Sequence, residues 1–299
     1  MGLSLANLIG RLPGGLAQGI IWGIMAIGVY LTFRVLKVSD LSVDGTFASG
    51  GCVTVMLIIN GINPLLALLA AALAGMAGGL VTGLLHTKCK IPAVLAGILT
   101  QYGLYSINLR IMNMSANTAC NPDRNVLLLS LRNVPKAILV ALVFALVIIA
   151  VLYWFFGTEA GSAIRATGSN VSISNALGIN IDTAKITAIA LSNGIVALAG
   201  GLMAQYQGFA DVKMGQGAIV IGLAAIIIGE VISSFIFGKK PLQFYTRLLM
   251  VIVGGIIYYF IMIIVLWLRF DSNDLKLCTA IIVALFLSLP NLTKRKAVY

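Results

Sequence analysis

The sequence contains 299 residues, of which 60% are apolar and 10% are charged, and its mean hydropathy is +1.04. Soluble domains carry roughly 25% charged residues, so this composition excludes a water-soluble core. It predicts one membrane domain spanning residues 1–299, with the lipid bilayer as its partner. We interpret the formal net charge of +11 as a topology signal, because cytoplasmic loops retain Lys and Arg. The sequence lacks a basic stripe interleaved with aromatic residues, which argues against nucleic-acid binding.

Apolar segments follow one another along the chain with short connections. A helix needs about 20 apolar residues to cross a bilayer, so the sequence predicts an all-α integral membrane protein of about nine transmembrane helices. The predicted spans are Gly14–Phe33, Val43–Ile59, Pro64–Leu85, Pro92–Leu109, Lys136–Phe156, Ala184–Gln205, Gly217–Phe237, Tyr245–Leu268 and Leu275–Leu289. Val43–Ile59 is short and rich in Gly, Ser and Thr, so it could be a broken or re-entrant helix.

The distribution of Lys and Arg indicates the orientation. A modest majority falls on the inner side if the N-terminus is outside and the C-terminus inside. The string Ala-Gly-Gly-Leu occurs at residues 77–80 and again at residues 199–202, three spans later. The two copies would run in opposite directions, which fits an inverted repeat of the kind found in transporters. Chance similarity between such common residues fits equally well.

Glycines recur at four-residue spacing in two predicted helices, at Gly15, Gly19, Gly23, Gly75, Gly79 and Gly83. This spacing places small surfaces on one helix face and predicts close helix packing. The packing could lie within the subunit or across a dimer.

Two loops are longer than turns. Residues 110–135 form a polar loop on the predicted extracytoplasmic side, and residues 157–183 form the longest predicted cytoplasmic loop. In the inner loop, Glu159 suits a first helical turn, while Gly168 and Gly178 suit helix ends, so one or two short helices are expected. A simple interfacial connection would have the same composition.

The inner loop also has a recognisable pattern of residues: Gly161, Arg165, Ala166, Ala176, Leu177, Gly178, Ile179 and Asn180. It resembles the cytoplasmic loop of the permeases that import branched-chain amino acids, ribose and related solutes. Two further segments, Asp40–Phe47 and Gly222–Glu230, more closely resemble a subgroup linked to tryptophan or tyrosine uptake.

The resemblance implies the permease subunit of an ATP-driven ABC importer for a small solute, with an amino acid expected and an aromatic one as the first guess. It implies a bacterial cytoplasmic membrane, a second permease copy in a homodimer or a close homologue, a separate ABC ATPase subunit and an extracytoplasmic solute-binding protein. In that family the inner loop carries the coupling helix, which sits in a groove of the ATPase. The residues expected to couple are Glu159, Gly161, Arg165, Ala166, Gly168, Asn170, Ala176, Leu177 and Gly178.

The sequence has no phosphate-binding loop of the form Gly-x-x-x-x-Gly-Lys-Ser/Thr. The only Gly-Lys pair, Gly238-Lys239, has Ser233 where the first glycine should be. We therefore expect no enzymatic activity and no cofactor in this chain, with ATP and Mg²⁺ bound by the partner ATPase. His, Cys, Asp and Glu do not cluster within the predicted spans, so neither a metal site nor a membrane-embedded enzyme is expected.

Polar residues within apolar spans are candidates for a translocation path. The polar candidates are Asp44, Gln101, Gln205, Gln207 and Glu230. Gly45 and Phe47 are candidates with them, because they belong with Asp44 to the segment that resembles the tryptophan or tyrosine uptake subgroup. Glu230 could equally extend to the cytoplasmic interface, and the glutamines could equally bond helix to helix. The alternative function is an ion-coupled secondary transporter, which predicts several buried ionisable groups, and only Glu230 stands out in the sequence.

Overall fold

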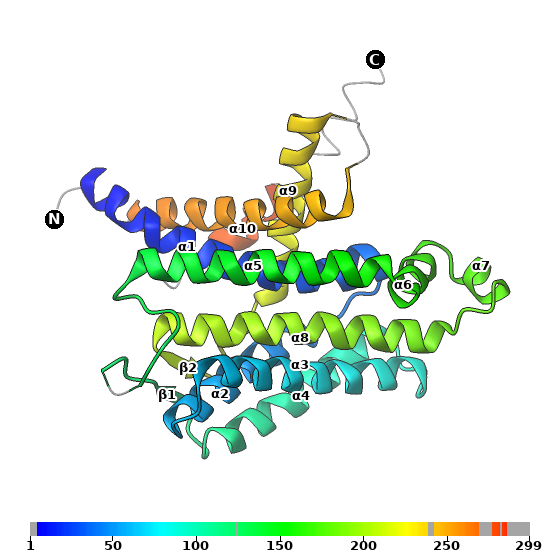
Figure 1. Ribbon diagram of the computed structural model, residues 1–299, viewed down its shortest axis with the longest axis horizontal. Coiled ribbons are helices and arrows are strands. Elements are labelled where there is room, and N and C mark those ends of the chain that lie inside the picture. The colour runs from blue at the N-terminus through cyan, green and yellow to red at the C-terminus, as the bar shows by residue number, and fades with distance from the viewer. Residues whose placement is uncertain (1–4, 124, 239–241, 269–276, 282, 286–299) are drawn as a thin grey trace.

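The computed structural model describes residues 5–123, 125–238, 242–268, 277–281 and 283–285, and it is predominantly helical (Figure 1). The helices are α1 (Leu5–Tyr30), α2 (Val43–Ile59), α3 (Pro64–Thr87), α4 (Ala93–Ile111), α5 (Val134–Gly157), α6 (Glu159–Ser169), α7 (Val171–Ala176), α8 (Ile181–Gln207), α9 (Ala218–Phe237) and α10 (Phe244–Trp267). A π-helical turn, η1 (Leu31–Leu36), extends α1, and two short strands, β1 (Asn117–Ala119) and β2 (Phe209–Asp211), pair antiparallel.

Within the described residues, 6 helical segments are long and apolar enough to cross a membrane, and α2 is a shorter apolar helix. The all-α membrane class predicted from composition is confirmed. Of the ninth predicted span, Leu275–Leu289, the structure describes only residues 277–281 and 283–285, so the count of about nine remains a prediction.

Most of the long helices run side by side (Figure 1), with α1 packed against α5, α8 and α10, and α3 against α8. The short helices α6 and α7 lie at one end of these helices, and β1 and β2 lie at the other. We refer to these as the α6/α7 end and the β1/β2 end. Helix α9 crosses the others steeply.

The four-residue glycine spacing brings helices of this same chain together. A Cβ on Gly19 would lie 2.6 Å from the Cα of Ile256 in α10, and one on Gly79 would lie 2.6 Å from the carbonyl oxygen of Ile189 in α8. Only glycine permits such close backbone approach. Both glycine stripes therefore pack inside the subunit.

Helix α2 begins beside the middle of its neighbour α8. The hydroxyl of Thr46 donates to Oδ1 of Asn193 at 2.6 Å, and Gly50 packs against the backbone of Ala197. Asn193 lies about 18 Å from the start of α8, a helix of about 40 Å, at 1.5 Å per residue. The segment predicted as broken or re-entrant is thus a helix that starts beside the middle of α8 and runs toward the β1/β2 end.

A buried carboxylate stabilises this start. Asp40 precedes α2 and accepts hydrogen bonds from the backbone amide of Ser42 at 2.8 Å, the hydroxyl of Ser42 at 2.6 Å and Nδ2 of Asn193 at 2.7 Å. These three donors compensate the desolvation of a carboxyl group that is 3% exposed. The sequence analysis did not identify Asp40 as a buried ionisable residue.

Asn and Thr side chains fix where several helices begin. The side chains of Asn63, Asn133, Thr158, Asn170 and Asn180 each accept a backbone amide in the first turn of the following helix. Such caps satisfy amides that lack a helical partner and each contributes about 0.5–2 kcal/mol. Two of them begin α6 and α7, so the short helices predicted in the inner loop are present.

Candidate functional site

A cleft of about 500 Å³ opens where the first turn of α2 faces the middle of α4. Its lining residues are Asp44, Gly45, Ile98, Gln101, Tyr102, Tyr105, Asn108, Val212 and Gln216. We call it the α2/α4 cleft. It brings together three of the residues predicted for the path: Asp44, Gly45 and Gln101.

Helical spacing explains why α4 presents a polar wall. Gln101, Tyr105 and Asn108 are separated by four and three residues, so they lie on one face of the helix. Gly45 lets α2 approach this face, because a Cβ there would lie 3.0 Å from the Cα of Gln101. Tyr102 extends the wall outward, and its side chain is 73% exposed. Helix α4 is not among the 6 segments that are long and apolar enough to cross a membrane, and its polar face suits contact with a polar path better than contact with lipid.

Asp44 carries the negative charge of the cleft. Its Oδ2 accepts the backbone amide of Gly217 at 2.9 Å and its Oδ1 accepts that of Ile219 at 3.0 Å. These amides lie at the N-terminus of α9, where the helix dipole favours an anion. Each carboxylate oxygen retains a further acceptor position. Asp44 can therefore hold α9 and accept a hydrogen bond from a cation in the cleft.

Asn108 lies at the junction of the cleft with a second cavity. An apolar groove of about 400 Å³ runs between α3 and α4, and Asn108 lines both spaces. The residue is 1% exposed, and neither its Oδ1 nor its Nδ2 has a hydrogen-bond partner among the described residues. We call this second cavity the α3/α4 groove.

The inner loop forms a compact unit at the α6/α7 end. Glu159 begins α6, and Nη2 of Arg165 donates to the hydroxyl of Ser162 at 3.2 Å. Gly168 contacts the chain after α1, because a Cβ there would lie 1.8 Å from the carbonyl oxygen of Val35 in η1. A groove of about 630 Å³ between α6 and the start of α8 is lined in part by Glu159 and Ala166. The loop thus exposes a groove while resting on η1.

The remaining residues predicted to couple lie in and beyond α7. Asn170 caps α7 through its side chain, and Ala176 ends that helix. Leu177 is 73% exposed, and Gly178 has a φ of +79°, which glycine adopts without strain. Gly161 lies against the backbone of Phe155 and Phe156.

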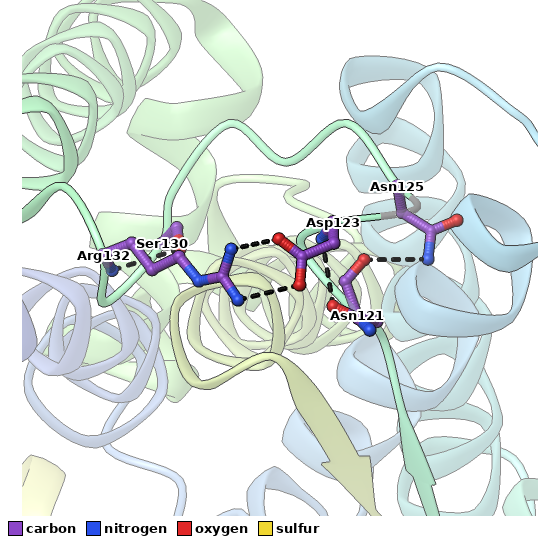
Figure 2. A network of polar contacts seen from close by, with 5 residues as sticks. All are labelled: Asn121, Asp123, Asn125, Ser130 and Arg132. Atoms are coloured by element: carbon purple, nitrogen blue, oxygen red, sulfur yellow. Dashed lines mark hydrogen bonds and ion pairs between the residues drawn. The ribbon is translucent and has the colours of Figure 1, made fainter.

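The outer loop is fastened to the β1/β2 end. The backbone amide of Leu128 donates to Oε1 of Gln205 at 3.0 Å, and that of Cys120 donates to the carbonyl of Gly208 at 2.8 Å. Figure 2 shows its polar network, in which Nη1 and Nη2 of Arg132 both donate to the carboxylate of Asp123. These bonds hold the pKa of the Asp123 carboxyl below its usual value. The loop is ordered by its own side chains and by the end of α8.

Comparison with known proteins connects this architecture to a family. The family described as branched-chain amino acid transport system / permease component matches residues 12–288. The chain belongs to this family. It is accordingly a multi-pass bacterial membrane protein that serves as a transport permease, as the sequence resemblance implied.

Individual relatives agree with the family. The permease is 41% identical over 284 residues to the tyrosine transport system permease protein of Clostridioides difficile strain R20291, covering 93% of this chain and 90% of that protein. It is 31% identical over 180 residues to an uncharacterized protein of Rickettsia prowazekii, covering 60% and 62%. It is 28% identical over 181 residues to the ribose import permease protein RbsC of Escherichia coli K12, covering 59% and 55%.

The other predicted path residues of the permease lie outside the α2/α4 cleft. Phe47 is fully buried and stacks on Trp22 with ring centroids 4.8 Å apart. Gln205 is buried under the outer loop, and Gln207 lines a separate small cavity of about 370 Å³. Glu230 forms an ion pair with Arg34. The predicted path residues thus fall into two groups. Some line the α2/α4 cleft, and the others are buried, line a separate cavity or form an ion pair.

The sequence analysis missed Tyr102, Tyr105, Asn108 and Gln216 of the permease's cleft. The sequence could have indicated Tyr105 and Asn108, because they continue the face of α4 that Gln101 begins. Gln216 lies in the turn before α9, so only the folded chain places it beside α2.

Proposed function

We propose that this permease is the membrane subunit of an ATP-driven ABC importer, and that it moves an amino acid across the membrane along the α2/α4 cleft. The observation that carries the proposal is the polar cleft with one carboxylate, Asp44, at the depth where α2 begins. A polar wall within apolar helices is costly unless it serves a polar solute.

The chemistry of the cleft suits an amino acid. The carboxylate of Asp44 would accept the solute's ammonium group, and the side-chain amide of Gln101 would donate to its carboxylate. Tyr102 and Tyr105 offer ring faces for an aromatic side chain. The relative named for tyrosine transport supports the aromatic choice.

The proposed assembly follows from the two ends of the molecule. In the proposed orientation, with the N-terminus outside and the C-terminus inside, the α6/α7 end is cytoplasmic. There α6 and the residues through Gly178 would meet a separate ABC ATPase subunit, which binds ATP and Mg²⁺. The β1/β2 end would receive the solute-binding protein, and a second permease copy would complete a homodimer. The inverted repeat stays a proposal, supported by the antiparallel packing of α3 and α8 and by the equivalent glycines Gly78 and Gly200, which face Thr46 and Phe47 of α2.

Transport would follow from a shift between two states of the permease. When ATP binding closes the ATPase subunits, their contacts with α6 would differ between the inward-open and outward-open forms of the permease. Only such a difference in contacts can shift the populations of the two forms. Gly168 against Val35 gives α6 a direct contact with η1 at the end of α1.

Reconstitution in proteoliposomes tests the proposal. The permease is combined with its ATPase and binding protein, and uptake of radiolabelled amino acid is followed with ATP and with a proton or sodium gradient alone. We expect uptake that requires ATP and the ATPase. Uptake on an ion gradient without the ATPase would instead establish the alternative, an ion-coupled secondary transporter.

Gln101→Leu tests the cleft in the same assay. Removing the amide that faces the solute is expected to lower uptake at least about tenfold, the equivalent of about 1.4 kcal/mol of lost binding. The matched control is Ser106→Leu, an equally apolar change at an exposed position of the same helix outside the cleft lining. Equal uptake by the two variants would move the path away from the α2/α4 cleft.

A further inference from the structure

Asn108 is a buried amide without a described partner, located where a polar cleft meets an apolar groove. Buried side-chain amides in native proteins nearly always have hydrogen-bond partners, because leaving one unpaired destabilises the fold. An exception at the edge of two cavities points to a partner that arrives from outside the chain. The side chain offers both donors on Nδ2 and an acceptor on Oδ1.

The spacing along α4 restricts what this partner is. Gln101 and Asn108 share one helix face and are two turns apart, about 10 Å at 1.5 Å per residue. Tyr105 lies between them on the same face. A solute whose charged groups meet Asp44 and Gln101 would extend past Tyr105 and bring its far end to Asn108. That distance suits an amino acid with a ring side chain rather than a small one.

The α3/α4 groove limits the polar groups available at this far end. Its walls near Asn108 come from the apolar residues Leu104, Ile107 and Ile111. The groove is also lined by Ser49 and Thr100, but their hydroxyls already donate to the backbone carbonyls of Gly45 and Ala96, each at 3.0 Å. A polar tip on the ring would therefore find the amide of Asn108 as its hydrogen-bond partner in this region of the described chain. A phenol hydroxyl suits an amide well, since it donates to Oδ1 and accepts from Nδ2.

We propose that Asn108 is a specificity-determining residue that binds the polar tip of an aromatic amino acid in the α2/α4 cleft. This rests on the proposed function of that cleft. A phenol would satisfy both sides of the amide, an indole N–H only the acceptor, and a phenyl ring neither. The permease would thus favour tyrosine over tryptophan, and tryptophan over phenylalanine.

The test isolates the permease from the selectivity of its binding protein. Radiolabelled tyrosine binding is measured on the permease–ATPase complex in nanodiscs without binding protein, and unlabelled tryptophan and phenylalanine compete. Because a site built to bond a hydroxyl strongly rejects the analogue that lacks it, tyrosine should bind at least about tenfold more tightly than phenylalanine. Asn108→Leu should bring that ratio close to one while phenylalanine still binds.

Two further variants keep the test decisive. Asn108→Ser retains a donor and an acceptor in a smaller side chain, so it should keep part of the preference even if the leucine variant folds poorly. Ser106→Leu, on another face of α4, should keep the full preference.

A tyrosine preference that persists in Asn108→Leu would overturn the inference, as would a wild-type complex that does not distinguish tyrosine from phenylalanine. Amino-acid uptake with ATP but without direct binding to the complex would overturn this inference alone. Absence of both ATP-dependent uptake and direct amino-acid binding would overturn the proposed function, and this inference with it.

Discussion

Asp44 shows how one side chain can serve the fold and the cleft together. Its two oxygens accept backbone amides of Gly217 and Ile219, yet the residue also lines the α2/α4 cleft. Hydrogen bonding to α9 needs an acceptor oxygen, whereas attraction of an ammonium group needs the charge. Substitutions can therefore separate the two contributions.

Asp44→Ala removes both the acceptor oxygens and the negative charge. We expect it to lower the free energy of unfolding by about 1–3 kcal/mol, the usual cost of leaving buried donors unpaired. Asp44→Asn keeps one of the two acceptor oxygens, so it should be less destabilising than Asp44→Ala while lowering amino-acid uptake at least about tenfold. Thermal unfolding in detergent and uptake in proteoliposomes measure the two effects. An Asn variant that transports like the wild type would contradict the role given to the charge.

The Asp123–Arg132 pair predicts a pH dependence of the outer loop. Hydrogen bonds from Arg132 lower the pKa of Asp123 from its usual 3.8. The pKa of Asp123 is lower in the folded state than in the unfolded state. The stabilisation by the ion pair is therefore fully present above the unfolded-state pKa and is lost as the pH falls through the folded-state pKa. Arg132→Gln should move the Asp123 midpoint up toward 3.8, which ¹³C-carboxyl NMR titration can follow. A midpoint unchanged by this substitution would mean that the pair does not form in solution.

At the residue scale, sequence reasoning recognised Asp44 and Gln101 because charge and amide groups stand out in apolar spans. It did not separate Phe47 from the path, since an aromatic residue in a small-residue helix suits a core as well as a channel. Asn108 was passed over because one asparagine near a helix end normally bonds a neighbouring helix. Only the folded structure shows that this asparagine lacks such a bond within the described residues.

The contact between α2 and α8 depends on glycine at the scale of whole elements. A Cβ on Gly50 would lie 1.8 Å from the carbonyl oxygen of Ala197, so Gly50→Ala must push the two helices apart. We expect a loss of about 1–3 kcal/mol, the range for overpacked cores. Gly103→Ala is the control, because nothing lies within 4 Å of its Cβ position. Melting temperatures that fall equally in both variants would argue against this close approach.

Helix α6 is the element that we expect to touch the ATPase. Glu159→Ala combined with Arg165→Ala removes two charges from it, while the Thr158 cap and the buried Gly161 and Gly168 remain. Binding of the ATPase should weaken at least about tenfold, as measured by surface plasmon resonance on nanodisc-embedded permease. Ser172→Ala on α7 serves as a control. Unchanged affinity in the double variant would remove α6 from the interface.

Element boundaries were predictable where local chemistry decides them. Glu159 and the glycines of the inner loop indicated its short helices, and hydropathy indicated the long helices. The depth at which α2 begins was not predictable, because composition does not report depth. It depends on Asn193, far along the chain, which bonds Asp40 and Thr46.

At the scale of the whole molecule, the exposed apolar side chains indicate what surrounds the protein. Outward faces of α3 and α5 expose large apolar side chains, among them Leu73 at 65% and Leu139 at 64%. Such faces require lipid or another protein subunit. Basic residues at the α6/α7 end, including Lys88 and Lys185, are consistent with placing that end in the cytoplasm.

A native cysteine can test this orientation. Cys89 is exposed in the turn between α3 and α4, near Lys88, while Cys52 and Cys120 are buried. Burial also raises the pKa of the Cys120 thiol, which lowers its reactivity. In a Cys278→Ser background, a membrane-impermeant maleimide should label inside-out vesicles and spare right-side-out ones. Ser115→Cys, near β1, should show the reverse pattern, and labelling of Cys89 from outside would invert the proposed topology.

The steep helix α9 is held at two separated points. Asp44 holds its first turn to α2, and Glu230, twelve residues after Ala218, pairs with Arg34 of η1. The same η1 supports α6 through Val35 and Gly168. Helix α9 therefore connects the wall of the α2/α4 cleft, through Asp44, with the contact between η1 and α6, through Glu230. A displacement of α6 that moves η1 must either move Glu230 as well or break the ion pair between Glu230 and Arg34. If the ion pair holds and α9 stays rigid, the first turn of α9 moves too, and with it the wall of the cleft beside Asp44.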